Sequence, residues 1–352
     1  MWTKDLLTPC VVIEKSIVEK NLHTAQKIFD AMNINFRPHI KTHKIPVIAK
    51  WQIELGAKGI NCQKISEAIP FVNAGIQDIL ITYNIMGTEK LNNLYDLSQK
   101  CDLKVTADSA VCIKGLSETF SKNNGTVKVL VECDTGAGRC GVQSPEEALK
   151  LAELIDTSEG LEFYGLMTYP APYSEVKTEE FLSTTKKLIE EKNIGVKMIT
   201  SGGTPSIFDA PKYSVITEYR AGTYIYCDRS LVTLGMCELS DCALTVQATV
   251  VSMPSDNRCI IDAGSKALTS DLLNQSDYGY IKQFSEAKII GLSEEHGTVD
   301  LSNCTTKPRI GDIINIIPNH CCPVTNLYNT VTYVTGNTVL ETYSVDARGC
   351  VV

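Results

Sequence analysis

The stretch Asn35-Phe36-Arg37-Pro38-His39-Ile40-Lys41-Thr42-His43-Lys44 joins a short apolar run to a segment with helical spacing, Ile45 to Leu55. It is one of several strand-to-helix junctions in the chain. Barrel enzymes place their chemistry at the carboxyl ends of parallel strands, where the loops gather. A lysine at that rim, such as Lys41, is therefore placed to reach a bound small molecule.

Four residues that can carry positive charge surround Lys41 in the sequence: Arg37, His39, His43 and Lys44. A lysine amine becomes a nucleophile toward carbonyl groups when desolvation or nearby cations lower its pKa. Charge clusters also occur on ordinary solvated surfaces, which is the plainer interpretation. Two of the five histidines of the chain lie in this stretch, and that favours a functional role.

Eight strand candidates succeed one another in the first two thirds of the chain. They are residues 35–40, 59–62, 78–83, 104–107, 128–133, 162–168, 197–200 and 218–226. The first seven are each followed by a segment of helical period, and the runs are short and apolar, as buried parallel strands are. This alternation predicts a (β/α)8 barrel, similar to a TIM barrel, in preference to an open sheet.

The pattern changes after about Leu234. Residues 241–253 alternate between polar and apolar and are rich in Val and Thr. Further strand candidates, with turns between them, are 260–263, 287–292, 298–301, 312–317, 330–334 and 339–343. Short strands separated by turns predict an all-β C-terminal domain.

The bulk composition limits the function classes. The chain has 352 residues, 43% of them hydrophobic, with a net charge of −8 and a pI near 5.3. Nucleic-acid binding calls for a basic footprint, which this chain lacks. No apolar run approaches the roughly 20 residues that a membrane helix needs, and the N-terminus has no secretory signal pattern. The fourteen scattered cysteines are interpreted as reduced thiols. We therefore expect a cytoplasmic enzyme without nucleic-acid or membrane partners.

Two segments after late strands have the composition of ligand-binding loops. Cys133–Gly141 is rich in glycine, which lets a backbone approach a ligand closely. Thr200–Ser206 combines a glycine turn, hydroxyl groups and a helix start, which together form a nest for anions such as phosphate. Either segment is also compatible with an ordinary loop.

Asn319–Asn326 contains the string His320-Cys321-Cys322 and is predicted to close a strand of the β domain. Residues two apart on extended backbone share a face, so His320 and Cys322 can converge on one ion while Cys321 points away. A two-residue pair is a weak signal, because zinc sites normally have three or four protein ligands. A purely structural pair is the alternative.

These strings resemble the D-threonine aldolase and D-serine dehydratase group of pyridoxal-phosphate enzymes, which have an alanine-racemase-like fold. Arg37–Lys44 resembles the cofactor-lysine segment of that group. Asp134–Gly141 matches Asp-Thr-Gly-x-x-Arg-x-Gly, and Arg220–Gly222 matches Arg-x-Gly, both similar to segments of alanine racemase. The resemblance covers nearly the whole chain. It implies a barrel over residues 14–234 and a β domain made of 1–13 with 235–352.

The resemblance also implies individual roles. Lys41, and not Lys44, would hold pyridoxal 5'-phosphate. Arg139 would contact the phenolic oxygen of the cofactor, and Arg220 its pyridine nitrogen. The phosphate would be bound by Ser201, Gly202, Gly203, Thr204 and Tyr224. His320 and Cys322 would bind a divalent metal. Imidazole and thiolate favour zinc, with manganese or magnesium as alternatives. Asp262–Lys266 also matches the group, either as a surface hairpin or as a contact near the metal or across a dimer.

The implied function is a metal-dependent lyase acting on a small D-3-hydroxy amino acid, with D-threonine aldolase first and D-serine dehydratase second. A racemase and a non-catalytic pyridoxal-phosphate carrier are further alternatives. No histidine lies between His43 and His296, where aldolases of the group often have one. His43, a tyrosine or metal-held water are therefore the candidates for the base that acts on the substrate hydroxyl. The resemblance also implies a homodimer.

Overall fold

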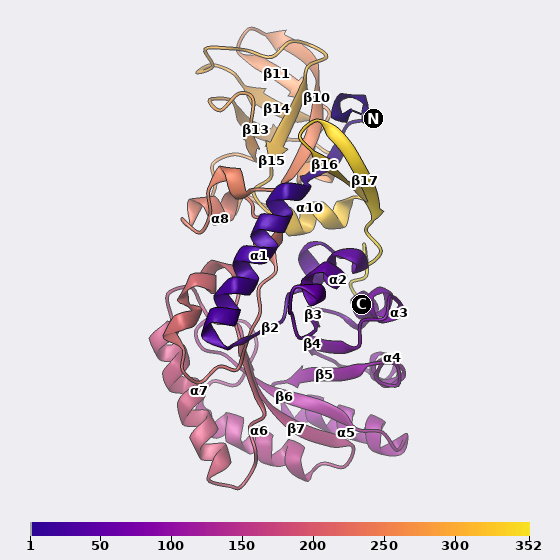
Figure 1. Cartoon of the computed structure of the whole chain (residues 1–352), viewed down its shortest axis with the longest axis vertical. Coiled ribbons are helices and arrows are strands. Elements are labelled where there is room, and N and C mark those ends of the chain that lie inside the picture. The colour runs from indigo at the N-terminus through magenta and orange to yellow at the C-terminus, as the bar shows by residue number, and fades with distance from the viewer. Residues whose placement is uncertain (1) are drawn as a thin grey trace. The chain divides into compact units, whose positions relative to one another are not determined.

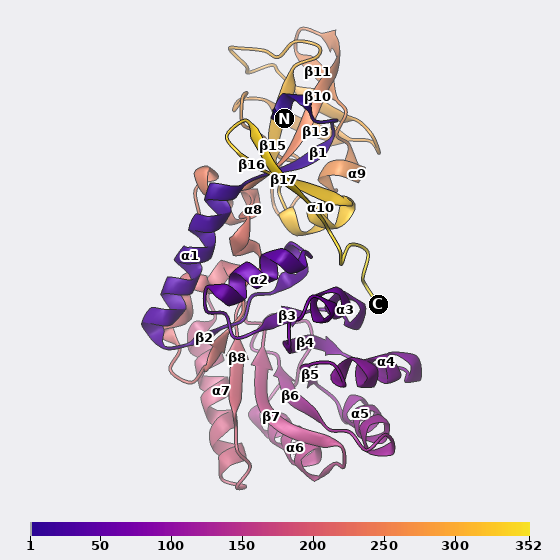
Figure 2. The same ribbon diagram turned by 45° about the vertical axis from the view of Figure 1, so that its right-hand side comes forward.

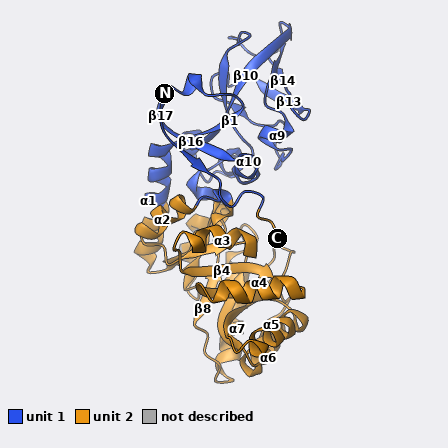
Figure 3. Cartoon of the chain, turned by 90° about the vertical axis from the view of Figure 1, so that its right-hand side faces the viewer, with its two compact units in different colours: residues 1–24, 42–45, 223–349 blue, residues 25–41, 46–222, 350–352 orange. Residues whose placement is uncertain are grey.

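The computed structural model describes residues 2–352, and the chain divides into two compact units (Figure 3). Unit 1 comprises Met1–Thr24, Thr42–Ile45 and Thr223–Gly349, and unit 2 comprises Ala25–Lys41, Pro46–Gly222 and Cys350–Val352. The domain bounds expected from the sequence, 14–234 and 1–13 with 235–352, stay a prediction. Within residues 2–352, no helix combines the length and the hydropathy needed to cross a bilayer.

Unit 2 is built on eight parallel strands in the order β2-β9-β8-β7-β6-β5-β4-β3. Their bounds are β2 Asn35–Phe36, β3 Ile60–Cys62, β4 Asp78–Asn84, β5 Asp102–Ala107, β6 Val127–Cys133, β7 Leu161–Thr168, β8 Met198–Ser201 and β9 Glu218–Tyr219. A parallel bridge between His39 and Asn61 joins the chain after β2 to β3. The sheet therefore curls into a TIM-like barrel, as predicted (Figure 2).

Helices follow these strands and lie outside the sheet of unit 2 (Figure 1). They are α2 Pro46–Glu54, α3 Ile65–Asn73, α4 Thr88–Ser98, α5 Ala110–Lys122, α6 Pro145–Thr157 and α7 Glu175–Glu190. Ser109 and Ser144 cap α5 and α6 by accepting hydrogen bonds from backbone N–H groups of the first turn.

The last part of the barrel differs from the prediction. The segment after β8 is a 3-10 stretch, η3 (Thr204–Lys212), instead of a regular α-helix. The strand predicted over 218–226 ends at Tyr219, and Thr223–Ile225 form a second 3-10 turn, η4. The reason is local: the N–H groups of Tyr226 and Cys227 both donate to Thr223 O, which closes a turn in place of a ladder.

Unit 1 contains a nine-stranded, mostly antiparallel sheet. Its strands are β1 Cys10–Glu14, β10 Leu244–Ser255, β11 Arg258–Ile261, β12 Tyr280–Ile281, β13 Lys288–Leu292, β14 Gly297–Asp300, β15 Ile313–Ile317, β16 Thr330–Thr335 and β17 Thr338–Ser344. β1 pairs antiparallel with β10 and parallel with β16, so the N-terminal strand lies inside a sheet made from the end of the chain (Figure 2).

Short helices connect the strands of unit 1. They are η1 Thr3–Asp5, α8 Arg229–Thr233, η5 Leu239–Asp241, α9 Ser265–Leu268 and α10 Cys321–Leu327. The long helix α1 (Lys15–Met32) follows β1. Of these elements, α8 and α10 position the side chains discussed next.

Candidate active site

Lys41 lies in a short 3-10 turn, η2 (Ile40–Thr42), directly after the bridge that closes the barrel. Its side chain is exposed, and its backbone N–H donates to His39 Nδ1 at 3.4 Å. The other ring nitrogen of His39, Nε2, lies 3.1 Å from Gln63 Oε1. Because Nδ1 accepts a backbone hydrogen bond, Nε2 carries the proton and the ring is neutral in this arrangement.

The cationic neighbourhood of Lys41 differs from the expectation. Arg37 is only 1% exposed and pairs with Glu218 (2.8 Å) and Asp78 (2.7 Å) inside the barrel. Lys44 is buried and donates to Ala347 O, while the buried His43 accepts from Ile45 N–H at Nδ1. The contacts of Arg37 and Lys44 are structural. Arg37 is therefore not a cation that acts on Lys41, because two carboxylates already neutralise it.

Two other arginines take that place. Burial and the charges of Lys41, Arg220 and Arg139 hold the pKa of His39 well below its usual value. All three cations therefore lie close enough to His39 to act on it electrostatically. They come from chain segments that follow β2, β9 and β6, so the carboxyl ends of three separate strands converge, as they do in barrel enzymes.

Arg139 is held by a loop that its own glycines shape. Asp134 Oδ1 accepts hydrogen bonds from Gly136 N–H (2.9 Å) and Gly138 N–H (3.1 Å), and both glycines have positive φ. The Arg139 guanidinium carbon lies 4.8 Å from the centre of the Tyr169 ring, and its side chain is 50% exposed. This leaves most of its N–H donors available to an anionic ligand.

Arg220 is buried beside the end of β7 and β8. It donates to Thr200 Oγ1 at 2.7 Å and to Thr168 O at 2.9 Å. Burial lowers its pKa to about 10, so it remains a cation at neutral pH. Burial also raises the pKa of the nearby Glu132 carboxyl, despite the opposing charges of Arg139 and Arg220. Sequence reasoning missed Glu132 and Tyr169; both stand at or just after the end of a predicted strand.

The glycine turn after β8 has the features of an anion cradle. Ser201 Oγ is fully buried and has no hydrogen-bond partner among residues 2–352. Gly202 has φ of 129°, and a Cβ there would come within 2.4 Å of Arg220 O. A Cβ on Gly203 would meet the Tyr169 ring at 3.0 Å, and Tyr219 donates to Gly203 O. A buried, unpaired hydroxyl beside such a turn requires a ligand or water to satisfy it.

His320 and Cys322 come together in unit 1, but not on a strand. β15 ends at Ile317, His320 is the N-cap of α10 with extended backbone, and Cys322 lies in the first turn of that helix. The prediction that the pair shares one face of a strand was therefore wrong. A cap residue and the second residue of a helix converge here because the chain turns between them, and the His320 and Cys322 side chains act on each other's pKa.

Further groups order this pair. Asp271 Oδ2 lies 2.8 Å from His320 Nδ1, which leaves Nε2 for another ligand. Thr42 and Thr223 place their hydroxyls 3.1 Å and 3.6 Å from Cys322 Sγ. The Cys321 thiol and His320 hold the pKa of Cys322 well below its usual value. Burial alone would lower the pKa of His320, but Cys322 and Asp271 raise it to about 9.

Cys321 is not turned away from the pair, as strand alternation would require. It is fully buried, its thiol acts on the pKa of Cys322, and its N–H donates to Asp228 Oδ2 at 3.0 Å. Among residues 2–352, no group of three or more His, Cys, Asp or Glu side chains has the arrangement of a metal site. The pair therefore provides two protein ligands at most.

The remaining predicted residues lie elsewhere. Tyr224 is buried in η4, and its contact with a phosphate stays a prediction. Asp262 accepts from Thr8 Oγ1 and Thr249 N–H, and so fastens the N-terminal segment to β10. Lys266 is exposed and pairs with Glu294 and Glu295, which matches the surface interpretation.

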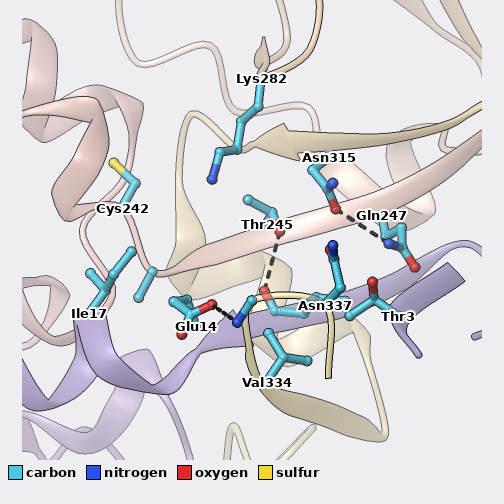
Figure 4. A pocket seen from close by; sticks show the side chains of 13 residues that line it. Thr3, Glu14, Ile17, Cys242, Thr245, Gln247, Lys282, Asn315, Val334 and Asn337 are labelled. Carbon is cyan, nitrogen blue, oxygen red and sulfur yellow. Dashed lines mark hydrogen bonds between the residues drawn. The ribbon is translucent and has the colours of Figure 1, made fainter. Parts of the chain in front are cut away.

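A pocket of about 230 Å3 within unit 1 contains none of the predicted site residues. Its polar lining includes Glu14, Gln247, Lys282 and Asn315 (Figure 4). The presence of a pocket alone therefore does not locate the candidate active site. The titratable groups and glycine turns described above indicate its position instead.

Comparison with known proteins matches both parts of the chain. The alanine racemase N-terminal domain profile matches residues 13–230, and a putative serine dehydratase domain profile matches residues 243–334. D-threonine aldolase of Arthrobacter sp is 34% identical over 359 residues, covering 97% of this chain and 93% of the relative. D-serine dehydratase of Dictyostelium discoideum is 28% identical over 361 residues, covering 90% and 91%.

A solved structure agrees with these sequence matches. The crystal structure of D-threonine aldolase from Filomicrobium marinum is 30% identical and superposes with a TM-score of 0.92, covering 99% of this chain and 98% of that one. Its similarity extends over both units.

Proposed function

This chain belongs to the D-threonine aldolase and D-serine dehydratase group of lyases with an alanine-racemase-like barrel, and from that membership we propose that it is a D-threonine aldolase. The proposed reaction cleaves a D-3-hydroxy amino acid to glycine and an aldehyde, with pyridoxal 5'-phosphate and a divalent metal as cofactors. The 34% identity to the D-threonine aldolase of Arthrobacter sp, against 28% to the D-serine dehydratase, favours this over the dehydratase.

The observation that carries a metal-assisted lyase is the His320–Cys322 pair with Asp271 behind it. This pair serves either reaction and by itself favours the dehydratase slightly, so the choice of an aldolase rests on the sequence similarity. A carboxylate on one ring nitrogen orients the other toward a metal, as in many metal sites. Two protein ligands leave coordination positions for substrate and water. A racemase needs a second base and no metal, and a carrier with only a barrel lacks the domain that contains this pair. Imidazole and thiolate favour zinc over manganese or magnesium.

The residues of unit 2 fit pyridoxal phosphate. We assign the phosphate to Ser201, Gly202, Gly203 and Thr204, because the buried Ser201 hydroxyl has no partner among residues 2–352 and a Cβ on either glycine would crowd Arg220 or Tyr169. Lys41 would hold the cofactor covalently, Arg139 would contact its phenolic oxygen and Arg220 its ring nitrogen. When bound, the cofactor supplies an electron sink for a bond broken at Cα of an amino acid.

The protein then selects the bond. His320 and Cys322 would hold a divalent ion, which would supply Lewis-acid chemistry at the substrate hydroxyl. In an aldolase, a base removes the hydroxyl proton; His43, a tyrosine and water held by the ion stay the candidates. In a dehydratase, the Lys41 amine removes the proton at Cα. Arg220 is a poor proton donor to the ring nitrogen, since its pKa stays near 10. This weakens the electron sink and makes assistance from the metal ion more important.

Product analysis tests the choice of reaction. The purified enzyme is incubated with D-threonine and with D-serine, each with and without a chelator. Glycine and acetaldehyde from D-threonine, lost with chelator and restored by zinc, are the expected result. Pyruvate and ammonia from D-serine would establish the dehydratase alternative instead. Full turnover in chelator, or exchange of the Cα proton without cleavage, would refute the metal-assisted lyase.

Variants of the metal pair provide the matched test. His320→Ala and Cys322→Ala should each remove the metal and lower turnover by orders of magnitude, because the ion contributes several kcal/mol of charge stabilisation. Binding of the cofactor to Lys41, read from visible absorbance, should persist. Cys321→Ala is the control: it should keep the metal, although it removes a buried thiol. Stoichiometric metal in His320→Ala would exclude the assigned pair.

We also retain a homodimer and a cytoplasmic location as proposals. Sedimentation analysis tests the first, and fractionation of cells tests the second.

A further inference from the structure

Three cysteines of unit 1 gather around α8. Cys227 precedes the helix, while Cys237 and Cys242 follow it. Cys227 and Cys242 pack in one core cluster with Leu231, and Cys237 packs against this cluster. The Cys227 and Cys242 thiols both act on the pKa of Cys237, so the three sulfurs are neighbours. All three lie within residues 227–242, and the turn of the chain through α8 brings their side chains together.

The three thiols differ in exposure. Cys227 is 7% exposed and Cys242 is 1% exposed, whereas Cys237 is partly open to solvent. Cys227 Sγ lies 3.4 Å from Tyr224 O and Cys242 Sγ lies 3.9 Å from Glu238 O, which anchors both buried side chains. Cys237 is therefore the member of the cluster that a solute meets first.

The pKa values of the three thiols also differ, and the most accessible thiol has the lowest pKa. The neighbouring Cys227 and Cys242 thiols lower the pKa of Cys237, whereas the Cys237 sulfur and burial raise the pKa of both neighbours. Unlike Cys237, two other accessible cysteines have raised pKa values because of burial. The pKa of the exposed Cys140 is raised, and that of the half-buried Cys101 is raised to about 11. Since the thiolate is the reactive form, exposure alone does not select the most reactive cysteine.

A second approach to the cluster exists. Cys242 forms part of the wall of the pocket of about 230 Å3 described above (Figure 4). A molecule as small as a peroxide can enter a space of this size, which is far larger than a single water. Cys242, one of the two buried members of the cluster, thus lies next to a cavity and not only in closed core.

We propose that Cys237 is a reversible oxidation site for peroxides, and that Cys227 or Cys242 resolves the oxidised sulfur into a disulfide. The Cys237 thiolate attacks one peroxide oxygen and breaks the O–O bond, which releases hydroxide from hydrogen peroxide and leaves a sulfenic acid. The neighbouring thiol then displaces the sulfenic oxygen as water. Two thiols and one hydrogen peroxide give one disulfide and two waters, so atoms and electrons balance.

The site is distinct from the metal pair and from Lys41. None of the three cysteines has a role in the proposed lyase reaction, although Cys227 adjoins Asp228, which accepts from the Cys321 N–H at the start of α10. The metal-loaded holoenzyme is the right material for the test, because bound metal protects the Cys322 thiolate.

The test treats reduced holoenzyme with hydrogen peroxide at a small excess. Free thiols are then counted in denaturant, and disulfide-linked peptides are identified by mass spectrometry. The expected result is the loss of two thiols, restored by dithiothreitol, with Cys237 linked to Cys227 or to Cys242. Reaction of Cys237 should be about tenfold faster than that of Cys140, because its two neighbouring thiols favour its thiolate form.

Matched variants separate the site from general oxidation. Cys237→Ser should abolish the rapid loss, whereas Cys101→Ser, at a cysteine of similar exposure, should react like the natural protein. In the double variant C227S/C242S, dimedone should trap Cys237 as a sulfenic acid. The proposal is overturned if Cys237→Ser still loses two thiols at the rate of the natural protein, or if the disulfide formed in the natural protein does not include Cys237.

Discussion

Asp271 Oδ2 lies 2.8 Å from Nδ1 of His320 and so fixes which nitrogen of the ring faces Cys322. The two residues are 49 positions apart in the chain. In a metal site, such a carboxylate orients the imidazole and raises its basicity. The pair therefore links a loop of unit 1 to the start of α10.

Replacement of Asp271 by asparagine should weaken metal binding by about ten- to a hundredfold, because the imidazole loses its orienting negative charge. Competition with a coloured chelator measures the affinity. Glu294→Gln, an exposed carboxylate of the same unit, is the control and should bind metal normally. Unchanged affinity in Asp271→Asn would show that the carboxylate serves only the fold.

Lys41→Ala should lose the visible absorbance of the lysine-bound cofactor, whereas Lys44→Ala should keep it. The reason is placement: the Lys41 side chain is exposed near Arg139 and Arg220, but Lys44 is buried against Ala347 O. Absorbance spectra of the reconstituted proteins decide the matter. The opposite pattern, with the band lost only in Lys44→Ala, would transfer the assignment to Lys44.

Substitution of Arg139 and of Arg220 should affect stability differently. Arg139→Ala should weaken cofactor binding with little effect on unfolding, because its side chain is half exposed. Arg220→Ala should weaken binding and also destabilise the fold by about 2–5 kcal/mol, since it strips two buried acceptors of their donor. Cofactor titration and urea unfolding of both variants provide the measurements. Equal stability of the two would contradict this division.

The Arg37–Glu218 pair should matter for stability alone. Arg37→Met leaves Glu218 buried without its partner and should cost about 3–5 kcal/mol. Lys187→Met removes an exposed pair with Glu191 at 4.0 Å and should cost less than about 1 kcal/mol. Urea unfolding of the two variants tests the contrast. A similar small loss in both would mean that the buried pair contributes no more than a surface one.

His39 predicts a dependence on pH. Its folded pKa is depressed, so the unfolded state binds the extra proton, and the stability from the neutral ring is lost as pH falls below about 6.5. Between about pH 7.5 and pH 5.5, cofactor-free natural protein should lose about 1.4 kcal/mol relative to His39→Gln. The comparison with the variant removes the opposite contribution of His320, whose pKa is raised. A constant difference between the proteins would show that His39 is free to protonate.

Much of the fold could be predicted from the sequence, because strand and helix periods are local properties. The eight short apolar runs of the barrel and the alternating runs after Leu234 all occur as strands, with bounds shifted by one or two residues in most cases. The last barrel strand was overextended, because the hydrogen bonds that close η4 at Thr223 have no signature in apolar spacing.

The candidate site, like the fold, was only partly predictable from the sequence. The sequence by itself determined the residue types at the strand ends: a lysine after β2, a glycine-shaped loop with Arg139, a Ser-Gly-Gly turn and an arginine after β9. Only the tertiary structure decided which charges meet. Arg37 is turned to Glu218 and Asp78, Asp271 is placed on His320, and Cys322 reaches its partner from a helix. Such pairings join residues far apart in the chain, and their energies depend on burial and distance, which no local pattern encodes.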